Sequence, residues 1–223
     1  MNRGSEPRET NRDAAGIAHC VIVAGPNGAG KTTASHALVT ERHGIQRIVN
    51  PDAIAVGLAG VAELGAIPAG KLALEAQRRY VDERADFAME TTVAGRRWTR
   101  LLDALNREQY RVSLYFLWMP DPALCVARVQ SRVMLGGHGI PEVDIRRRYE
   151  SGLQNLRDVF IPRVDEWQLY DATARAGTRR IAQGGRDRET VVRDDALWQR
   201  VRHSLVLRQA SALPNDSSRE EAS

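Results

Sequence analysis

The sequence contains few cysteines and no long hydrophobic run. Its two cysteines, Cys20 and Cys125, match no metal-ligand spacing, so we expect reduced thiols in the core of a cytoplasmic protein. No apolar stretch approaches the ~18 residues that would span a bilayer, which argues against a membrane protein. The first sixteen residues are polar and do not form a secretory signal.

Length and charge limit the number of domains and the class of partner. A chain of 223 residues with 43% hydrophobic side chains can bury one complete core, so we expect a single domain. We assign residues 17–208 to this domain and expect disordered polar tails at 1–16 and 209–223. The net charge is only +4, and basic residues are not interleaved with aromatic ones, so the sequence gives no support for a nucleic-acid partner.

Short apolar segments alternate with segments of helical periodicity. Candidate strands are 18–24, 46–49, 86–89, 111–118 and 167–170, with 178–183 as a short edge strand. Apolar residues recur three and four positions apart between them, and a last segment of this kind, 194–207, is expected to close the fold. The alternation predicts an α/β fold, a three-layer sandwich in which helices cover both faces of a parallel sheet.

A glycine-rich segment follows the first candidate strand. It matches the phosphate-binding loop pattern G-x-x-x-x-G-K-[ST] and reads Gly25-Pro26-Asn27-Gly28-Ala29-Gly30-Lys31-Thr32-Thr33. Glycines let such a loop direct backbone N–H groups at phosphate oxygens, next to the positive end of the following helix. Lys31 would bring charge to the terminal phosphates, which makes it a binding and a catalytic candidate, and the Thr32 hydroxyl would ligate Mg²⁺. We therefore predict ATP and Mg²⁺ as cofactors of a P-loop NTPase.

Residues that directly follow the strands are further candidates, because ligands of such sheets bind beyond the carboxyl ends of the strands. Asp52 follows the second strand and can act as a general base or metal contact, or simply cap the next helix. Glu90 follows the third strand, where a lone carboxylate has no obvious capping role, so we predict that it binds substrate or supports the metal. Thr91 and Thr92 are candidate substrate-binding residues, or β-formers that end the strand.

Arginines occur on two predicted helices that a glycine-rich break joins. Arg128 and Arg132 are four residues apart on the first helix and therefore project from one face. The second helix, after the break at 135–139, carries three consecutive arginines, Arg146, Arg147 and Arg148. We interpret the segment at about 125–150 as a helical lid.

A lid of this kind would bring guanidinium charge to a transferring phosphate and exclude water from it. We assign Arg128 to nucleotide binding and choose Arg132, the arginine nearest the break, as the catalytic one. The alternative for each of these arginines is a solvated basic surface. His138, between glycines, is interpreted as a turn residue rather than a catalytic one.

Other classes of P-loop protein lack support. Transporter-type ATPases need an LSGGQ-like signature, but the only Gly-Gly pairs, at 136–137 and 184–185, belong to no such motif. They also need a strand that ends in Asp-Glu, whereas 111–118 continues into Met119-Pro120. The Asn-Lys-x-Asp motif for guanine is absent. What remains is a compact kinase that phosphorylates a hydroxyl group of a small acceptor.

Several motifs together resemble the zeta-toxin-like kinases, in particular their small chromosomal branch. They are the loop, Asn50-Pro51-Asp52, Ala88-Met89-Glu90-Thr91-Thr92, the strand at 114–120, and R-V-x-x-R-V-x-x-G-G-H-x-I-P-E with I-R-R-R-Y at 128–149. The resemblance covers about 18–175. It implies a nucleotide-kinase-like core that uses ATP and Mg²⁺.

The resemblance also carries roles and partners. In the characterised toxins the acceptor is the 3′-hydroxyl of UDP-N-acetylglucosamine, so a UDP-sugar is a candidate acceptor here. By position, Asp52 would be the catalytic base, Glu90 the acid on the substrate side, and lid arginines the γ-phosphate contacts. The lid spacing departs from that of the classical toxins, which leaves the choice among Arg132, Arg146 and Arg147 open. A separate antitoxin protein is a candidate partner.

Two functions stay open. The first is a kinase that acts on a nucleotide sugar or a similar small acceptor. The second is an ATP-binding regulatory or toxin-antitoxin-associated ATPase with slow turnover, in which binding matters more than catalysis. A polynucleotide-end kinase is a third and weaker alternative, because the basic and aromatic residues are not arranged for it.

Overall fold

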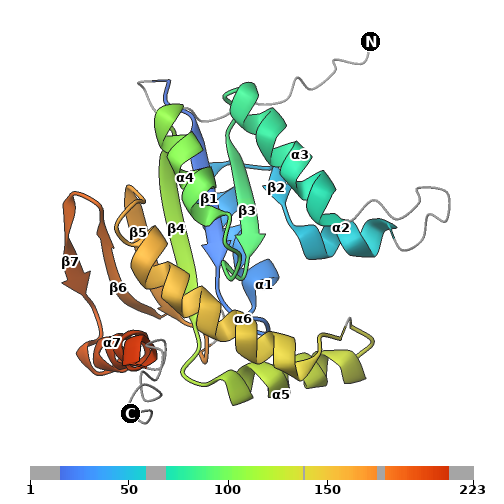
Figure 1. The fold of residues 1–223 in the computed structure, drawn as a ribbon, viewed down its shortest axis with the longest axis vertical. Coiled ribbons are helices and arrows are strands. Elements are labelled where there is room, and N and C mark those ends of the chain that lie inside the picture. The colour runs from blue at the N-terminus through green and yellow to red at the C-terminus, as the bar shows by residue number, and fades with distance from the viewer. Residues whose placement is uncertain (1–15, 59–68, 138, 175–178, 211–223) are drawn as a thin grey trace, which may run out of the picture.

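The strand β1 (His19–Ala24) lies at the centre of a seven-stranded sheet, as the computed structural model shows (Figure 1). The structure describes residues 16–58, 69–137, 139–174 and 179–210. The strand order is β2-β3-β1-β4-β5-β6-β7. The other strands are β2 (Ile48–Val49), β3 (Phe87–Thr91), β4 (Arg111–Trp118), β5 (Glu166–Asp171), β6 (Arg180–Gly185) and β7 (Arg188–Val192).

Helices connect the first five strands and cover the sheet. They are α1 (Lys31–Ser35) with its π-helical continuation η1 (His36–Glu41), α2 (Pro51–Leu58), α3 (Ala69–Asp82), α4 (Trp98–Arg107), α5 (Pro122–Met134), α6 (Glu142–Asn155) with the π-helical η3 (Leu156–Phe160), and α7 (Asp195–Ala210). Figure 1 shows α4 and α6 in front of the sheet. Every residue of β4 from Val112 to Trp118 is buried, so both faces of this strand are covered, as the predicted α/β fold requires.

The sheet is mixed rather than entirely parallel. The strands β2, β3, β1, β4 and β5 run parallel, as predicted, and β6 and β7 add an antiparallel edge whose direction the sequence does not predict. The strand β6 begins and ends two residues later than the predicted edge strand at 178–183. The sequence does not predict β7, because most of this strand is exposed and it lacks the apolar pattern of a buried one.

The last helix extends further than predicted. The helix α7 runs past the predicted closing segment at 194–207 and includes Gln209 and Ala210, which the sequence assigns to the C-terminal tail. Residues 1–15 and 211–223 of the two expected tails lie outside the described residues. Gly16, the last residue of the expected N-terminal tail, is described. Helical periodicity alone cannot fix such ends, because it fades gradually where a helix leaves the core.

Both cysteines are free and buried, as predicted. Cys20 lies in β1, where burial raises the pKa of its thiol well above the usual range. Cys125 lies in α5, where burial raises the pKa of its thiol to about 11. Within the described ranges, no helix combines the length and the apolar character that a membrane-spanning segment needs.

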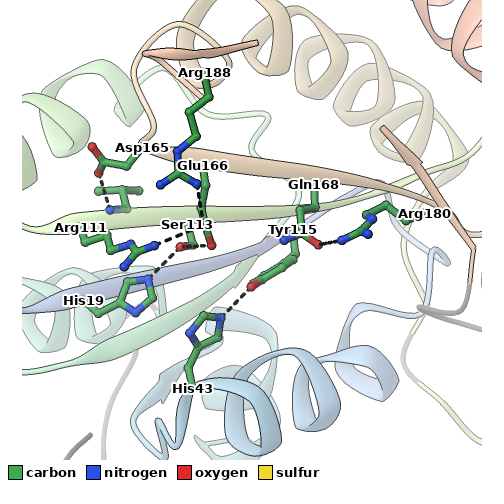
Figure 2. Close-up of polar contacts among 11 residues, drawn as sticks. His19, His43, Arg111, Ser113, Tyr115, Asp165, Glu166, Gln168, Arg180 and Arg188 are labelled. Atoms are coloured by element: carbon green, nitrogen blue, oxygen red, sulfur yellow. Dashed lines mark hydrogen bonds and ion pairs between the residues drawn. The ribbon is translucent and has the colours of Figure 1, made fainter. Parts of the chain in front are cut away.

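A polar cluster lies toward the amino ends of the central strands, away from the glycine-rich loop (Figure 2). His19 Nε2 is 2.8 Å from Ser113 Oγ, and this hydroxyl donates to Glu166 Oε1 at 2.8 Å. His43 Nε2 is 2.6 Å from the Tyr115 hydroxyl, and the rings of His19 and His43 meet edge to face with centroids 4.7 Å apart. His19 and Glu166 begin β1 and β5, so this cluster stabilises the sheet at the end opposite the loop.

The cluster predicts a loss of stability in acid. Burial lowers the pKa of His43 to about 4, with a further contribution from His19 and Arg42. Because an unfolded histidine titrates near ~6.5, the unfolded chain takes up the proton first, and stability is lost as the pH falls from about 6.5 toward 4. We expect a loss on the order of 1–2 kcal/mol, because the side chain is only half buried and solvent screens part of the effect.

Urea unfolding at pH 7 and pH 5 checks this prediction. A His43→Gln variant keeps a polar partner for Tyr115 but cannot be protonated, so it should lose less stability than the wild type between the two pH values. Equal losses in both proteins would assign the acid sensitivity to other groups.

Candidate active site

The glycine-rich loop leaves the carboxyl end of β1 in close contact with the neighbouring elements. An added Cβ at Gly25 would lie 2.5 Å from the Leu117 carbonyl oxygen, and one at Gly28 would lie 3.0 Å from the Cys125 carbonyl oxygen. The φ angle of Gly28 is +79°, in the left-handed region that favours glycine. The loop therefore packs directly on β4 and α5, and larger residues at these two positions would displace it.

Lys31 and Thr32 open α1 and lie where the sequence predicts. Lys31 Nζ donates to the carbonyl oxygens of Gly25 at 2.9 Å and Pro26 at 3.0 Å, so the side chain folds back along the loop. Thr32 Oγ1 donates to Glu90 Oε2 at 2.9 Å. Thr33, the next residue, is exposed. An anion at the loop would find a lysine and a hydroxyl already placed beside it.

Glu90 connects the loop to the end of β3. This carboxylate is only 6% exposed, and its Oε2 accepts hydrogen bonds from Thr32 Oγ1 and from Asn50 Nδ2, both at 2.9 Å. Two donors satisfy a buried carboxylate that would otherwise be costly to hold. Of the two roles predicted for Glu90, this position fits support of a metal ion at Thr32 more directly than contact with an acceptor.

Asn50 orders both Glu90 and the start of α2. Its Oδ1 accepts the N–H of Ala53 at 3.2 Å, its carbonyl accepts the N–H of Ile54 at 3.0 Å, and Pro51 occupies the first helical position. This is the geometry of a helix N-cap, so the alternative in which Asp52 caps the helix is wrong. Asp52 is the second residue of α2, and its side chain lies outside the described part of the structure.

Asn50 is the site residue that sequence reasoning misses. The signal is present, since a residue that caps well stands directly before a proline, which is the usual order of N-cap and first helical position. Asp52 is a competing candidate for the cap, because an aspartate caps a helix about as well as an asparagine does. What the sequence cannot show is that the same amide also donates to Glu90, forty residues further along the chain.

Thr91 and Thr92 continue the chain beyond Glu90, on the same edge of the sheet as the loop. Thr91 pairs with Ala24 in the sheet, and its Oγ1 accepts the N–H of Val93 at 3.0 Å, so its hydroxyl is used within its own turn. Thr92 is half-buried, and no hydrogen bond of its side chain is found within the described ranges. Thr92 is therefore the better placed of the two to contact a ligand.

Arg128 reaches from α5 across the loop to the chain that follows β5. Its Nη1 donates to the Ala172 carbonyl at 2.7 Å and to the Gly28 carbonyl at 3.4 Å, and its Nη2 donates to the Thr173 carbonyl at 3.4 Å. In the same loop, Asn27 is 4% exposed, and its Oδ1 has no hydrogen-bond partner among the described residues. A buried acceptor left open in this way is suited to a donor that arrives with a ligand or a closing element.

The glycine break ends α5 with a Schellman motif. The N–H of Gly136 donates to the Val133 carbonyl and that of Gly137 to the Arg132 carbonyl, both at 2.9 Å, and the φ angle of Gly136 is +86°. Arg132 is exposed, and its Cγ would lie 2.6 Å from a Cβ added at Gly137. His138 lies outside the described residues. The glycine pair therefore stops α5 and turns the chain toward α6.

The arginines of α6 point in different directions around the helix, as consecutive residues must. Arg146 pairs with Glu142 at 2.7 Å and Arg147 with Asp144 at 2.8 Å, all on an exposed surface. Exposed pairs of this kind contribute about 0–1 kcal/mol, so a stronger anion would displace the partner. Arg148 is half-buried and forms no ion pair within the described ranges. The structure does not bring the three arginines together at one point.

The strand order β2-β3-β1-β4-β5, with a phosphate-binding loop after the central β1, defines a P-loop protein of the nucleotide-kinase type. The family model for the zeta toxin matches residues 9–174, and the chain belongs to this family. An uncharacterized protein of Haemophilus influenzae is 25% identical over 130 residues, which are 58% of this chain and 91% of that protein.

Several solved structures share the fold of this chain. The AvrRxo1-ORF1:AvrRxo1-ORF2 complex with sulphate ions aligns with a TM-score of 0.66 and 15% identity over 83% of this chain. The same complex with ATP aligns with a TM-score of 0.64 and 16% identity. The chain spans only 63% of the matched chain in both. The PezAT chromosomal toxin-antitoxin system of Streptococcus pneumoniae aligns with a TM-score of 0.57 and 15% identity over 91% of this chain and 88% of that one.

Proposed function

We propose that this protein is an ATP-dependent kinase that transfers the γ-phosphoryl group of ATP to a hydroxyl group of a small acceptor. The observation that carries the proposal is the hydrogen-bonded group of Thr32, Glu90 and Asn50. It joins the loop after β1, the end of β3 and the start of α2, where Asp52 lies. Membership of the zeta toxin family and the ATP complex of a protein with the same fold support the same reading.

The residues at the loop fit ATP and Mg²⁺. Gly25 and Gly28 let the loop pack closely on β4 and α5, and Lys31 lies along the loop with its ammonium group on loop carbonyls. The Thr32 hydroxyl and the Glu90 carboxylate beside it are oxygen donors of the kind that Mg²⁺ prefers. When bound, the ion neutralises negative charge on the phosphate oxygens.

In the proposed phosphoryl transfer, each candidate residue has its own role. Asp52 accepts the proton of the acceptor hydroxyl as a general base. Lys31 and the lid arginine Arg132 stabilise the charge on the phosphoryl group in transit. Arg128, bridging the loop and the end of β5, holds the nucleotide. The acceptor lies at the end of β3, which includes Glu90 and Thr91, and against Thr92 directly after it.

Membership of the zeta toxin family supports a proposal for the acceptor and for a partner. We propose a UDP-sugar as the acceptor, with the 3′-hydroxyl of UDP-N-acetylglucosamine as the first choice. We also propose a separate antitoxin protein as a partner, which the toxin-antitoxin complex of Streptococcus pneumoniae supports.

Incubation of the protein with ATP·Mg²⁺ and a panel of UDP-sugars tests the function. We expect one acceptor to gain the mass of one phosphate by mass spectrometry, and we expect no gain with a Lys31→Ala variant. Tight ATP binding without transfer to any small hydroxyl acceptor would contradict the kinase and favour the ATP-binding regulatory protein.

The proposed lid predicts that a change at its hinge affects phosphoryl transfer more than it affects ATP binding. Replacing Gly136 and Gly137 together with alanine should destabilise the fold by roughly 1–2 kcal/mol, because alanine resists the φ of Gly136 and its Cβ at Gly137 would collide with Arg132. If the pair is the hinge of the lid, phosphoryl transfer should slow more than ATP affinity falls. Gly139→Ala is the control, since this glycine lies in the same connection and its Cβ would make an ordinary contact at 3.4 Å. Unchanged turnover in the double variant would reduce the pair to a helix stop.

A further inference from the structure

A strained segment, Thr92–Gly95, follows β3 on the acceptor side of the site. Val93 in this segment has a φ of +50° and is completely buried. A β-branched residue rarely adopts this conformation, so the surrounding structure must hold it there. Strain of this kind is common where a protein pre-positions a ligand contact.

The helix α6 supplies the contacts that hold the segment. Asn155 Nδ2 donates to the Val93 carbonyl at 2.6 Å and to the Gly95 carbonyl at 2.9 Å. Three residues earlier, a Cβ added at Gly152 would lie 2.7 Å from the Thr92 carbonyl oxygen, so only glycine permits this approach. Asn155 also stands where α6 passes into the π-helical η3, and π-helical turns are frequent at functional sites.

Trp98, at the start of α4, adds a second unfavourable feature next to the segment. Trp98 is 3% exposed, and its Nε1 has no hydrogen-bond partner among the described residues. A Cβ added at Gly95 would lie 3.6 Å from this nitrogen. A strained Val93 and an unsatisfied indole N–H are both unfavourable, and Asn155 holds the carbonyls of Val93 and Gly95 in this segment.

We propose that Asn155 is a positioning residue that fixes Thr92–Gly95 for the acceptor and couples this segment to the lid. This rests on the proposed kinase function. The coupling follows from the course of α6, which begins at Glu142 beside the glycine break and ends at Asn155 on the acceptor segment. Figure 1 shows α6 as one continuous helix that runs from α5 across the front of the sheet. When ATP binds, a shift of α6 at its Glu142 end is transmitted along this helix to Thr92.

Hydrogen exchange measured by mass spectrometry tests the positioning role of Asn155 without any acceptor. Asn155→Ala removes both hydrogen bonds and should speed exchange of the amides at 91–97 by roughly tenfold, since two ordinary hydrogen bonds are lost. Gln154→Ala is the matched control, because this amide residue is equally half-buried and does not bond the segment. ATP·Mg²⁺ should slow exchange at 91–97 in the wild type and in Gln154→Ala but not in Asn155→Ala. Unchanged exchange in Asn155→Ala, or equal protection by ATP in all three proteins, would overturn the proposal.

Kinetics separate the positioning role from the kinase itself. With the acceptor found in the UDP-sugar panel, Asn155→Ala should raise the KM for the acceptor at least tenfold while the affinity for ATP changes less than about twofold. Asn155→Gln, which keeps the amide, should recover part of the loss. If no UDP-sugar is phosphorylated, the acceptor proposal fails, and the exchange experiment still decides whether Asn155 positions the segment. Gly152→Ala, which pushes on the Thr92 carbonyl, should also speed exchange at 91–97, and it replaces Asn155→Ala if that variant does not fold.

Discussion

Replacing Lys31 with alanine is expected to lower the affinity for ATP·Mg²⁺ roughly ten- to hundredfold, the loss typical of a charge-assisted contact. In the free protein its ammonium group lies on the carbonyls of Gly25 and Pro26, which a phosphate chain would replace as partners. The variant should retain the backbone amides of the loop, so some binding should remain. Isothermal titration calorimetry measures the affinity, and circular dichroism checks that the fold is native.

The chain offers a matched control for this charge. Lys71, the only other lysine, is exposed in α3. Lys71→Ala makes the same change in net charge and side-chain size away from the loop, and it should leave ATP affinity unchanged. Equal losses in the two variants would reduce the effect to general electrostatics. No loss in Lys31→Ala would place the nucleotide elsewhere.

Asp52→Asn is expected to slow phosphoryl transfer by roughly 10²–10⁴-fold, the contribution of a positioned general base. Asparagine keeps the size of the side chain but cannot accept the proton of the acceptor hydroxyl. The helix should not suffer, because Asn50 is the residue that caps α2. We therefore expect near-native melting temperature and ATP affinity together with the loss in rate. A stopped assay of phosphate transfer at saturating ATP measures the effect.

Asp121→Asn controls for the removal of a strand-end carboxylate. Asp121 follows β4 and caps α5, where its Oδ1 accepts the N–H of Ala123 at 2.7 Å, a role that asparagine also fills. Its rate of transfer should stay close to that of the wild type. An intact rate in Asp52→Asn would end the general-base proposal. A weaker dependence of ATP binding on Mg²⁺, with little change in rate at saturating metal, would assign Asp52 to the metal instead.

The central sheet and the loop are predictable because one local pattern determines each of them. The strand at 111–118 is mostly apolar, with Arg111 and Ser113 as the exceptions, and the structure reproduces it as β4 with the same ends. The phosphate-binding loop depends on glycines and a lysine within a few residues of each other, so its place after β1 can be read without knowledge of the rest. Local signals of this kind do not require contacts between distant segments.

What the sequence cannot give are the contacts between distant strand ends and loops. Asn50 and Glu90 are recognised as partners only once β2 and β3 lie side by side. Asn155 looks like an ordinary polar residue near the end of a helix until the structure places it against Val93. The same limit applies to β7, whose pairing with β6 depends on a hairpin rather than on an apolar pattern.

The antiparallel strands β6 and β7 cover an edge of the sheet that β5 would otherwise leave open. The family match ends at residue 174, just after β5, and a sheet that stopped there would offer the free backbone groups of β5 to any other chain. In the structure β6 occupies that edge, and the outermost strand becomes β7, which is short and begins with the charged Arg188 and Glu189. A charged, short border resists the strand-by-strand addition that leads to aggregates. The C-terminal strands therefore replace an open edge at β5 with a short and charged one.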